Sequence, residues 1–412
     1  MNGKVLGSIA AVVVVAAAAA GYFFFGAEKK VMLGDIELYV FVQSTTTPEL
    51  AVIDVAHEEL VTRVRLAAVP DVMVVAKEPK RVIYANRATN SVHIYDIATQ
   101  ADDAVITLPF SPDNMVMSPD SFMIAATDTE TGQFGAIDIE ATLTAAREMG
   151  AGTSVFTPSD LVEKKLGFVL EQTFYKPSKV VFSDDSVFVF IADSLTGILS
   201  TIDTASGAVL DPIQLSLHVG VVDDPDGDEL SALTRTPDGL YGLVTQNTDG
   251  FVSIVNMRSW AENLVLRVGR GASRAYGTAD GIYMMVGNDL DKTMTVLKTD
   301  PWEVAATLPA VAGVTSISTG FFEKLAYVVS NPENRVAVIN LETLTNDAYI
   351  DLPGGPGVGI ADADGKKLYV PLHDSNSLAV IDIYNMRVHK IIPNVTEAPW
   401  GVAMASTNNY CH

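Results

Sequence analysis

Apolar and polar residues alternate along most of this chain in short runs, and the runs come in pairs. Two examples are RVIYANRATNSVHIYDIAT, starting at Arg81, and KKLYVPLHDSNSLAVIDIYN, starting at Lys366. Each pair is joined by residues such as Asn, Asp and Ser, which favour tight turns. An alternation of period two, interrupted by such turns, is typical of antiparallel hairpins. The pattern therefore predicts an all-β protein built from successive hairpins.

The hairpins recur at a fixed interval. The second strand of each ends in a polar residue, and these residues are Asp54, Asp96, Asp138, Asp203, Asn256, Lys298, Asn340 and Asp382. Five of the seven intervals between them are 42 residues, and the other two are 65 and 53. Another apolar run precedes the hairpins, as in PDVMVVA from Pro70, and a fourth follows, as in AVITL after Asp103. Four strands in about 42 residues make one blade of a β-propeller.

The sequences of the strands resemble those of the YVTN family of β-propeller repeats. The residues that carry this resemblance are Ile83-Tyr84-Ala85-Asn86, Leu368-Tyr369-Val370, Val338-Ile339-Asn340 and Ile381-Asp382. The resemblance covers about residues 35 to 407 and implies a propeller fold. It says little about function, because the motif is structural.

Eight hairpins predict an eight-bladed propeller. The segment Trp400–Ser406 has the sequence pattern of an innermost strand, but no hairpin follows it. The first hairpin, in contrast, has no innermost strand before it. We therefore expect the C-terminal strand to complete the first blade, which closes the ring and removes its exposed edges. The alternative is a seven-bladed ring with one degenerate hairpin outside it.

The N-terminus has the length and composition of a membrane-spanning helix. Residues 5–27 are 23 residues without a charge, with three phenylalanines, Phe23–Phe25, close to their end, and roughly 20 apolar residues cross a bilayer as a helix. A cleaved signal peptide, with Ala18–Ala20 as its cleavage site, and a buried helix are the alternatives. We expect an anchor over residues 1–30, a propeller over 31–407 on the periplasmic or extracellular side, and a tail over 408–412.

Charge and cysteine content narrow the function classes. The formal net charge is −23, which argues against binding to nucleic acid and against electrostatic docking on anionic lipid. The single cysteine, Cys411, excludes an intrachain disulfide and a cysteine-based metal cluster. The six histidines show no metal-ligand spacing, and no nucleophile or phosphate-loop motif occurs. We assign no catalytic residue, and we interpret the recurrent Asp and Asn as turn formers.

The two longer intervals contain insertions that carry candidate sites. In the insertion near 211–229, Asp223, Asp226 and Asp228 could hold Ca²⁺, the one cofactor that the sequence suggests, or belong to a solvated acidic loop. In the insertion near 141–176, the segment LVEKKLGFVLEQ predicts a short amphipathic helix capped by Asp160. Its stripe, which includes Leu161 and Leu166, is a candidate contact for a partner or ligand, with simple lid packing as the alternative.

Innermost strands surround the axis of a propeller, and three residues near it stand out. Arg235 and Arg274 are notable because cations are scarce in this chain, and Trp400 stands on the strand expected to close the ring. The two arginines could bind an anionic ligand or a partner's carboxylate, or pair with acids on a neighbouring blade. These observations favour a membrane-anchored scaffold or accessory subunit that binds other membrane or extracytoplasmic proteins. A redox or dehydrogenase-type subunit and a surface-layer or adhesion protein are the alternatives.

Overall fold

A computed structural model describes residues 31–170, 174–217 and 228–405. The predicted anchor at 5–27 and the tail at 408–412 lie outside these ranges. No helix within them is both long and apolar enough to cross a membrane. The chain forms two compact units, Met1–Leu33 and Gly34–His412, and the fold described below is that of the second unit.

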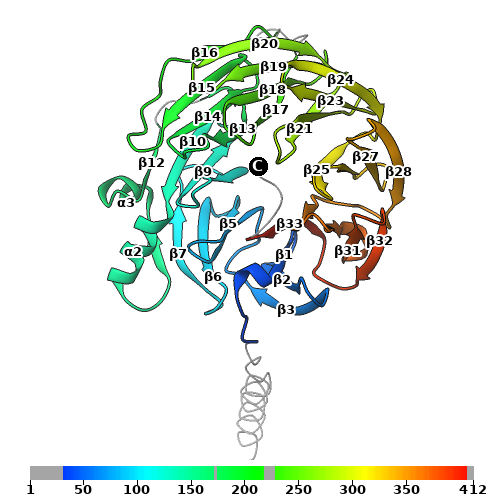
Figure 1. Ribbon diagram of the computed structural model, residues 1–412. Coiled ribbons are helices and arrows are strands. Elements are labelled where there is room, and N and C mark those ends of the chain that lie inside the picture. Colours follow the sequence, from blue (N-terminus) through cyan, green and yellow to red (C-terminus); the bar gives the residue numbers. More distant parts are fainter. Residues whose placement is uncertain (1–30, 171–173, 218–227, 406–412) are drawn as a thin grey trace, which may run out of the picture. The chain divides into compact units, whose positions relative to one another are not determined.

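Eight sheets are arranged around a common axis (Figure 1), and each is one blade; all are antiparallel except for one added parallel strand in blade 2. We number the blades in chain order and give the strands of each from the axis outward. Blade 1 contains β33 (Pro399–Met404), β1 (Tyr39–Ser44), β2 (Glu49–Asp54) and β3 (Glu59–Arg65). Blade 2 contains β4 (Val72–Ala76), β5 (Arg81–Asn86), β6 (Ser91–Asp96), β7 (Ala101–Thr107) and β11 (Ser154–Phe156). Blade 3 contains β8 (Asn114–Met117), β9 (Met123–Asp128), β10 (Gln133–Asp138) and β12 (Gly167–Val169). Blade 4 contains β13 (Pro177–Phe182), β14 (Phe188–Asp193), β15 (Ile198–Asp203) and β16 (Ile213–Gln214).

The second half of the ring repeats the same order. Blade 5 contains β17 (Leu230–Arg235), β18 (Tyr241–Gln246), β19 (Phe251–Asn256) and β20 (Ala261–Arg267). Blade 6 contains β21 (Ala272–Gly277), β22 (Tyr283–Asn288), β23 (Thr293–Thr299) and β24 (Trp302–Pro309). Blade 7 contains β25 (Val314–Gly320), β26 (Leu325–Ser330), β27 (Arg335–Asn340) and β28 (Thr345–Asp351). Blade 8 contains β29 (Ile360–Ala361), β30 (Lys367–Leu372), β31 (Ser377–Asp382) and β32 (Arg387–Ile392). The short helices are η1 (Ile36–Leu38), α2 (Ile139–Met149), α3 (Pro158–Glu163) and η2 (His373–Ser375).

The prediction of an eight-bladed ring closed by its C-terminal strand is confirmed. Strand β33 pairs antiparallel with β1, with Val40 opposite Met404 and Val42 opposite Val402. Each innermost strand also contacts the innermost strands of the two neighbouring blades, all the way round the axis. The core lies between blades, as in the cluster that joins Val40 and Ile53 of blade 1 to Val380 of blade 8.

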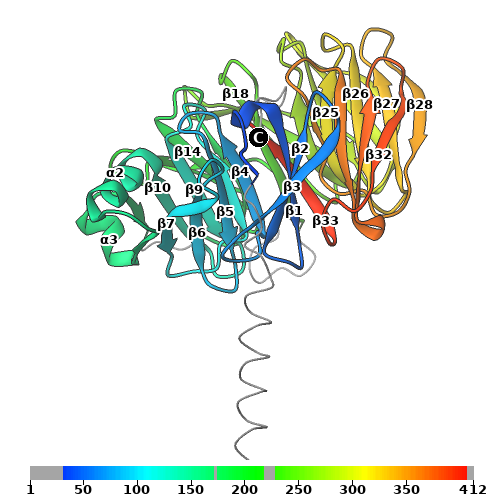
Figure 2. The ribbon, with the colours of Figure 1, turned by 90° about the horizontal axis from the view of Figure 1, so that it is seen from below.

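The strand directions define two faces of the ring, seen edge-on in Figure 2. The turns between first and second strands, and between third and fourth strands, lie on the face where β1 begins at Tyr39. We call this the N-terminal face. The turns between second and third strands, and the connections between blades, lie on the opposite face.

The polar residue that ends the third strand of a blade is a turn former, as the sequence predicted. The Asp96 carboxylate accepts a hydrogen bond from the Ala98 amide at 2.8 Å, and the Asn340 side chain accepts one from the Glu342 amide at 3.0 Å. Seven blades share this arrangement, and Lys298 stands at the position in blade 6. These contacts show that the repeated Asp and Asn side chains hold the turns in place.

The first insertion differs from the prediction. Its helix α3 is only six residues long, and its cap is Thr157, not Asp160, which sits at the third helical position and accepts a hydrogen bond from the Thr157 amide. Pro158 fixes the start of the helix. Gly167 has a φ of +152° and begins β12, because blade 3 still needs a fourth strand against β10. The stretch predicted to be one helix is therefore a helix followed by a strand.

A second helix in this insertion was missed. Helix α2 starts directly after Asp138, whose carboxylate accepts a hydrogen bond from the Ala141 amide, and ends before Gly150. Both cap residues are visible in the sequence. After α2 the chain crosses to blade 2, where β11 pairs in parallel with β7, before it returns through α3 to blade 3. Figure 1 shows both helices at the outer rim of the ring.

Candidate functional site

Two recessed cations from different blades lie within electrostatic range of each other near the ring axis. Lys179 in β13 and Arg274 in β21 occupy equivalent positions. Each lies directly after a shift in the pairing register of its strand. Each then pairs with the second-last residue of the neighbouring strand. Strand β17 runs between them and has Ala232 at this position.

Neither cation has a carboxylate partner in the described part of the chain. The Arg274 guanidinium donates through Nε to the Val314 carbonyl at 2.9 Å, and it forms no ion pair with a described acid. Among the described residues, none gives the Lys179 ammonium a hydrogen bond or an ion pair. Both side chains are partly reached by solvent. An unpaired cation that is recessed from water costs free energy, which an incoming anion would recover.

The electrostatics of the pair follow from this burial. Burial lowers the pKa of the Lys179 ammonium to about 8, with the charge of Arg274 adding to the fall and that of Asp113 opposing it. Burial also lowers the pKa of Arg274, against the nearby Asp289. At pH 7 the Lys179 ammonium is mostly charged, because its pKa of about 8 lies above 7, and an arginine guanidinium is not deprotonated in proteins. The Asp113 carboxylate is itself engaged by the amide and hydroxyl of Thr129.

Arg235, the other predicted arginine, lies at the far end of its strand. It is the last residue of β17, it is buried, and its guanidinium donates to the neighbouring Thr236 carbonyl at 3.4 Å. The structure therefore brings Arg274 together with Lys179 and leaves Arg235 nearer the N-terminal face. Lys179 was missed in the sequence, although PSKVVF places it at the same step of its strand as Arg274.

Trp400 lies apart from these cations, in the wall of a small cleft on the face opposite the N-terminal face. The cleft has a volume of about 420 Å³ and lies between blades 7 and 8 and the start of β33, with Asn331, Asn334, His373, Asp374 and Trp400 in its wall. The His373 ring meets the Trp400 ring edge-on, with 6.4 Å between centroids. Trp400 is thus beside the axis, as predicted, but on the face away from Arg235.

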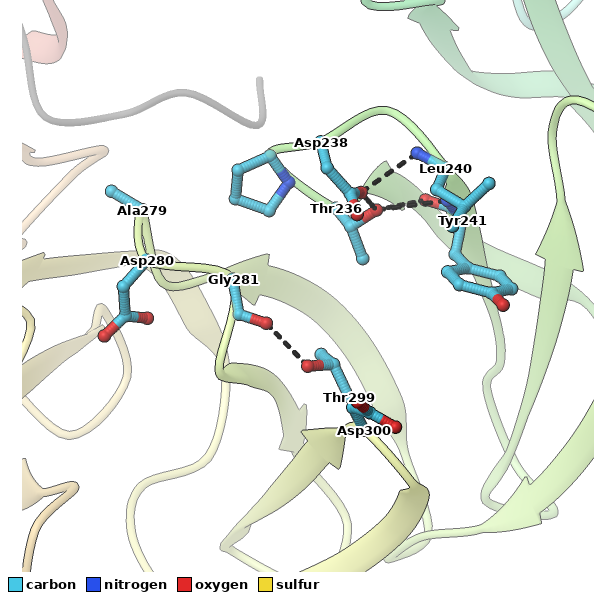
Figure 3. Close-up of a pocket in the computed structure, with 10 residues that line it drawn as sticks. Thr236, Asp238, Leu240, Tyr241, Ala279, Asp280, Gly281, Thr299 and Asp300 are labelled. Carbon is cyan, nitrogen blue, oxygen red and sulfur yellow. Dashed lines mark hydrogen bonds between the residues drawn. The ribbon is translucent and has the colours of Figure 1, made fainter.

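A larger cleft of about 690 Å³ lies on the N-terminal face between blades 5 and 6 (Figure 3). Asp238 and Asp280 in its wall are committed to their own turns, where they accept hydrogen bonds from Thr236 and Thr278 at 2.5 and 2.6 Å. Figure 3 shows Thr299 bonded to the Gly281 carbonyl, with Asp300 beside it. The wall is acidic and already hydrogen-bonded, which makes it a poorer candidate for an anion than the axis.

The predicted calcium loop is only partly visible. Asp223 and Asp226 lie outside the described residues, so the calcium site stays a prediction. Asp228 is described and is buried, and its carboxylate accepts hydrogen bonds from the Thr248 and Asp249 amides at 2.7 to 2.8 Å. Over the described ranges, no cluster of three or more His, Cys, Asp or Glu side chains could hold a metal ion.

Leu161 and Leu166 lie in the core and not on the surface. Both are almost completely buried, in a cluster with Ile139 and Leu143 of the insertion and Phe156 of β11. Their burial favours the lid-packing alternative over a contact with a partner.

One buried network has the residue types of a catalytic triad. The Ser91 hydroxyl lies 2.9 Å from His93 Nε2, and His93 Nδ1 lies 3.0 Å from Asp102. The three residues are only 3%, 4% and 8% exposed. The Tyr84 ring stacks on His93 at 4.4 Å, and burial raises the pKa of Tyr84, helped by the charge of Asp102. Because no substrate could reach Ser91, this network is structural.

Comparison with known proteins supports the fold class. No family model and no curated protein sequence matches the chain, so the YVTN resemblance stays a prediction. Among solved structures, it is similar to "Dihydro-heme d1 dehydrogenase NirN in complex with DHE", with a TM-score of 0.66 and 16% identity over 92% of this chain and 77% of that one. It is also similar to Kuenenia stuttgartiensis hydrazine synthase, with a TM-score of 0.53 and 17% identity over 87% and 98%. A third match is apo AztD from Citrobacter koseri, with a TM-score of 0.60 and 13% identity over 89% and 97%. At such identities the likeness shows the propeller fold alone.

We expect the Lys179 ammonium to make stability depend on pH in a defined window. Its folded pKa of about 8 is below the ordinary value of 10.5, so the unfolded chain binds more protons between these values and wild-type stability rises with pH there. Relative to Lys179→Met, the unfolding free energy of the wild type should climb by up to about 3 kcal/mol between pH 8 and 10.5. Denaturant titrations of both proteins across this range measure it, and parallel curves would refute the burial of the charge.

Proposed function

We propose that this chain is a membrane-anchored, extracytoplasmic propeller that serves as an accessory binding subunit and receives a carboxylate-bearing ligand at its axis. The observation that carries the proposal is the pair of recessed cations, Lys179 and Arg274, which have no carboxylate partner in the described ranges. In a chain of net charge −23, such a pair forms a local positive site that attracts an anion.

The two side chains would contribute differently to the recognition of a carboxylate. A guanidinium presents a planar fork that fits a carboxylate in two-point contact, whereas an ammonium acts as a compact point charge. Because Arg274 already donates one bond to a carbonyl, its orientation is fixed before a ligand arrives. A bound carboxylate would restore the Lys179 pKa toward its ordinary value, so we expect affinity to fall as the pH rises past 8.

A thermal-shift titration with citrate tests the proposal. The full chain in detergent is melted at pH 7 in increasing citrate, against sodium chloride at equal ionic strength. We expect citrate to raise the Tm of the wild type and of the charge-matched control Arg258→Met/Lys298→Met, and to lose its effect in the double variant Lys179→Met/Arg274→Met. If citrate is no better than chloride, or if the axial double variant responds like the wild type, the axial site is wrong.

A redox subunit is the second candidate function. NirN is described as a dihydro-heme d1 dehydrogenase in complex with DHE, and a cation pair would suit the carboxylates of a tetrapyrrole equally well. Absorbance titration with haemin separates the two: a shifted haem band that disappears in Lys179→Met/Arg274→Met would favour this role. An unshifted spectrum would leave the accessory binding role as the better account.

A further inference from the structure

One position on the N-terminal face repeats in every blade. It is the residue directly before the second strand, and the eight residues are Leu38, Lys80, Phe122, Val187, Leu240, Ile282, Lys324 and Lys366. Five are apolar and three are lysines. Four of the apolar side chains, those of Leu38, Phe122, Val187 and Ile282, are 41% to 53% exposed.

The backbone holds this position firmly. In blade 1 the Leu38 carbonyl accepts a hydrogen bond from the Val55 amide at 3.0 Å, and in blade 6 the Ile282 carbonyl accepts one from Thr299 at 3.1 Å. The same bond, from the turn after the third strand, occurs in seven of the eight blades. The exposed side chains are therefore presented on fixed turns at regular steps around the ring.

Blade 7 adds an aromatic group to the same face. Phe321, Phe322 and Glu323 all have positive φ values, 52°, 57° and 60°, a conformation that costs free energy for residues with side chains. The result is that Phe322 projects with 85% of its surface exposed. The Phe321 ring contacts both Phe322 and Tyr384 of blade 8, at centroid distances of 5.7 and 4.9 Å, and Tyr384 is itself 65% exposed.

The two faces differ in the number of exposed large hydrophobic residues in their described turns and loops. In the described turns of the N-terminal face, the exposed large hydrophobic residues are Leu38, Phe122, Val187, Trp260, Ile282, Phe322 and Tyr384. In the described loops of the opposite face they are Tyr175 and Leu290. Scattered single residues need no explanation, but a set gathered on one face indicates something that covers it.

The chain itself indicates what that covering is. The uncharged run of 23 residues ends at Ala27, seven residues before Gly34, and a seven-residue link spans at most about 25 Å. The ring is entered on the N-terminal face, because β1 begins there at Tyr39. If residues 5–27 span a bilayer, this link permits the same face to reach the bilayer surface.

We propose that the N-terminal face of the ring lies in the headgroup region of a lipid bilayer, with Phe322, Tyr384 and Ile282 among its contact points. The inference rests on the proposed membrane anchor. Exposed aromatic rings are suited to the headgroup region, and lysines at equivalent positions can extend their charges toward lipid phosphates. The acidic turns of this face, including Asp120, Asp185, Asp238 and Asp280, favour a zwitterionic lipid over an anionic one.

Site-directed spin labels test the proposal. Single cysteines are introduced as Phe322→Cys, Ile282→Cys and, as a matched control on the opposite face, Leu290→Cys, in the full chain carrying Cys411→Ser. The chain is reconstituted in phosphatidylcholine nanodiscs, and the accessibility of each nitroxide to oxygen and to a water-soluble nickel chelate is compared. We expect the labels at 322 and 282 to favour oxygen, as in lipid, and the label at 290 to favour nickel.

Two further readouts keep the outcomes distinct. Nickel-accessible labels at all three positions, in a chain that still floats with vesicles after an alkaline wash, would overturn the docked face and leave the anchor standing. A chain that washes off the vesicles would contradict the anchor itself. Dipolar broadening at 322 that grows with protein concentration, without oxygen access, would show a second copy of the chain on this face and also overturn the proposal.

Discussion

Removing the last strand is expected to destroy the closed ring. A chain that ends at Ala398 lacks β33, which supplies the innermost strand of blade 1 and buries Val402, Ala403 and Met404. The loss of those buried side chains alone costs about 5 kcal/mol, and β1 is left with an unpaired inner edge. We expect the Tm to fall by about 6 °C or more.

The matched control is a chain that ends at Ala405, which keeps β33 and removes only the residues beyond the described range. Circular dichroism melts of the two truncated chains in the same detergent measure the difference. A synthetic peptide of residues 397–405, added to the shorter chain, should pair with β1 and restore part of the lost Tm. Equal melting of both truncations would show that the ring does not depend on its closing strand.

Asp102→Ala is expected to destabilise the protein more than any substitution at its surface. It leaves His93 buried with one ring nitrogen unpaired, and it removes the acceptor that both His93 and Tyr84 contact. Leaving a buried polar group without its hydrogen-bond partner typically costs about 1–3 kcal/mol. For a domain of this size, we expect the Tm to fall by about 1–4 °C.

The neighbouring Asp103→Ala provides the control. Asp103 is a partly exposed carboxylate 2.6 Å from Arg81, and Arg81 retains a second acid, Asp96, at 3.4 Å. Its loss should cost less than about 1 kcal/mol. Denaturant unfolding of both variants compares them directly, and similar losses would mean that the Ser91–His93–Asp102 network contributes little.

The repeat was predictable because two signals agree. The interval of 42 residues and the Asp or Asn at the end of most third strands both arise from turn chemistry, which is local and therefore visible in sequence. The closing strand was also predictable, because Trp400–Ser406 has no hairpin after it. Both predictions needed only the order of residues along the chain.

The structure of the insertion and the pairing of cations at the axis were harder to predict from the sequence. In the insertion, the stretch after Asp160 has helical periodicity, but Gly167–Val169 form a strand because they pair with the open edge of blade 3. This pairing depends on residues that are distant in the sequence. At the axis, Arg274 was recognised as a rare cation. Lys179 was not, because its proximity to Arg274 depends on how three neighbouring blades are arranged around the axis.

Strand β11, which belongs to the insertion of blade 3, is part of the sheet of blade 2, and no other pair of neighbouring blades shares a named strand in this way in the described sheets. Adjacent blades of a propeller are held by side-chain packing, but here backbone hydrogen bonds of the blade 3 insertion extend the sheet of blade 2. Part of the outer edge of β7 is thereby paired and unavailable to other chains. When the rim frays, these two blades should open and reclose together, as one cooperative unit of the ring.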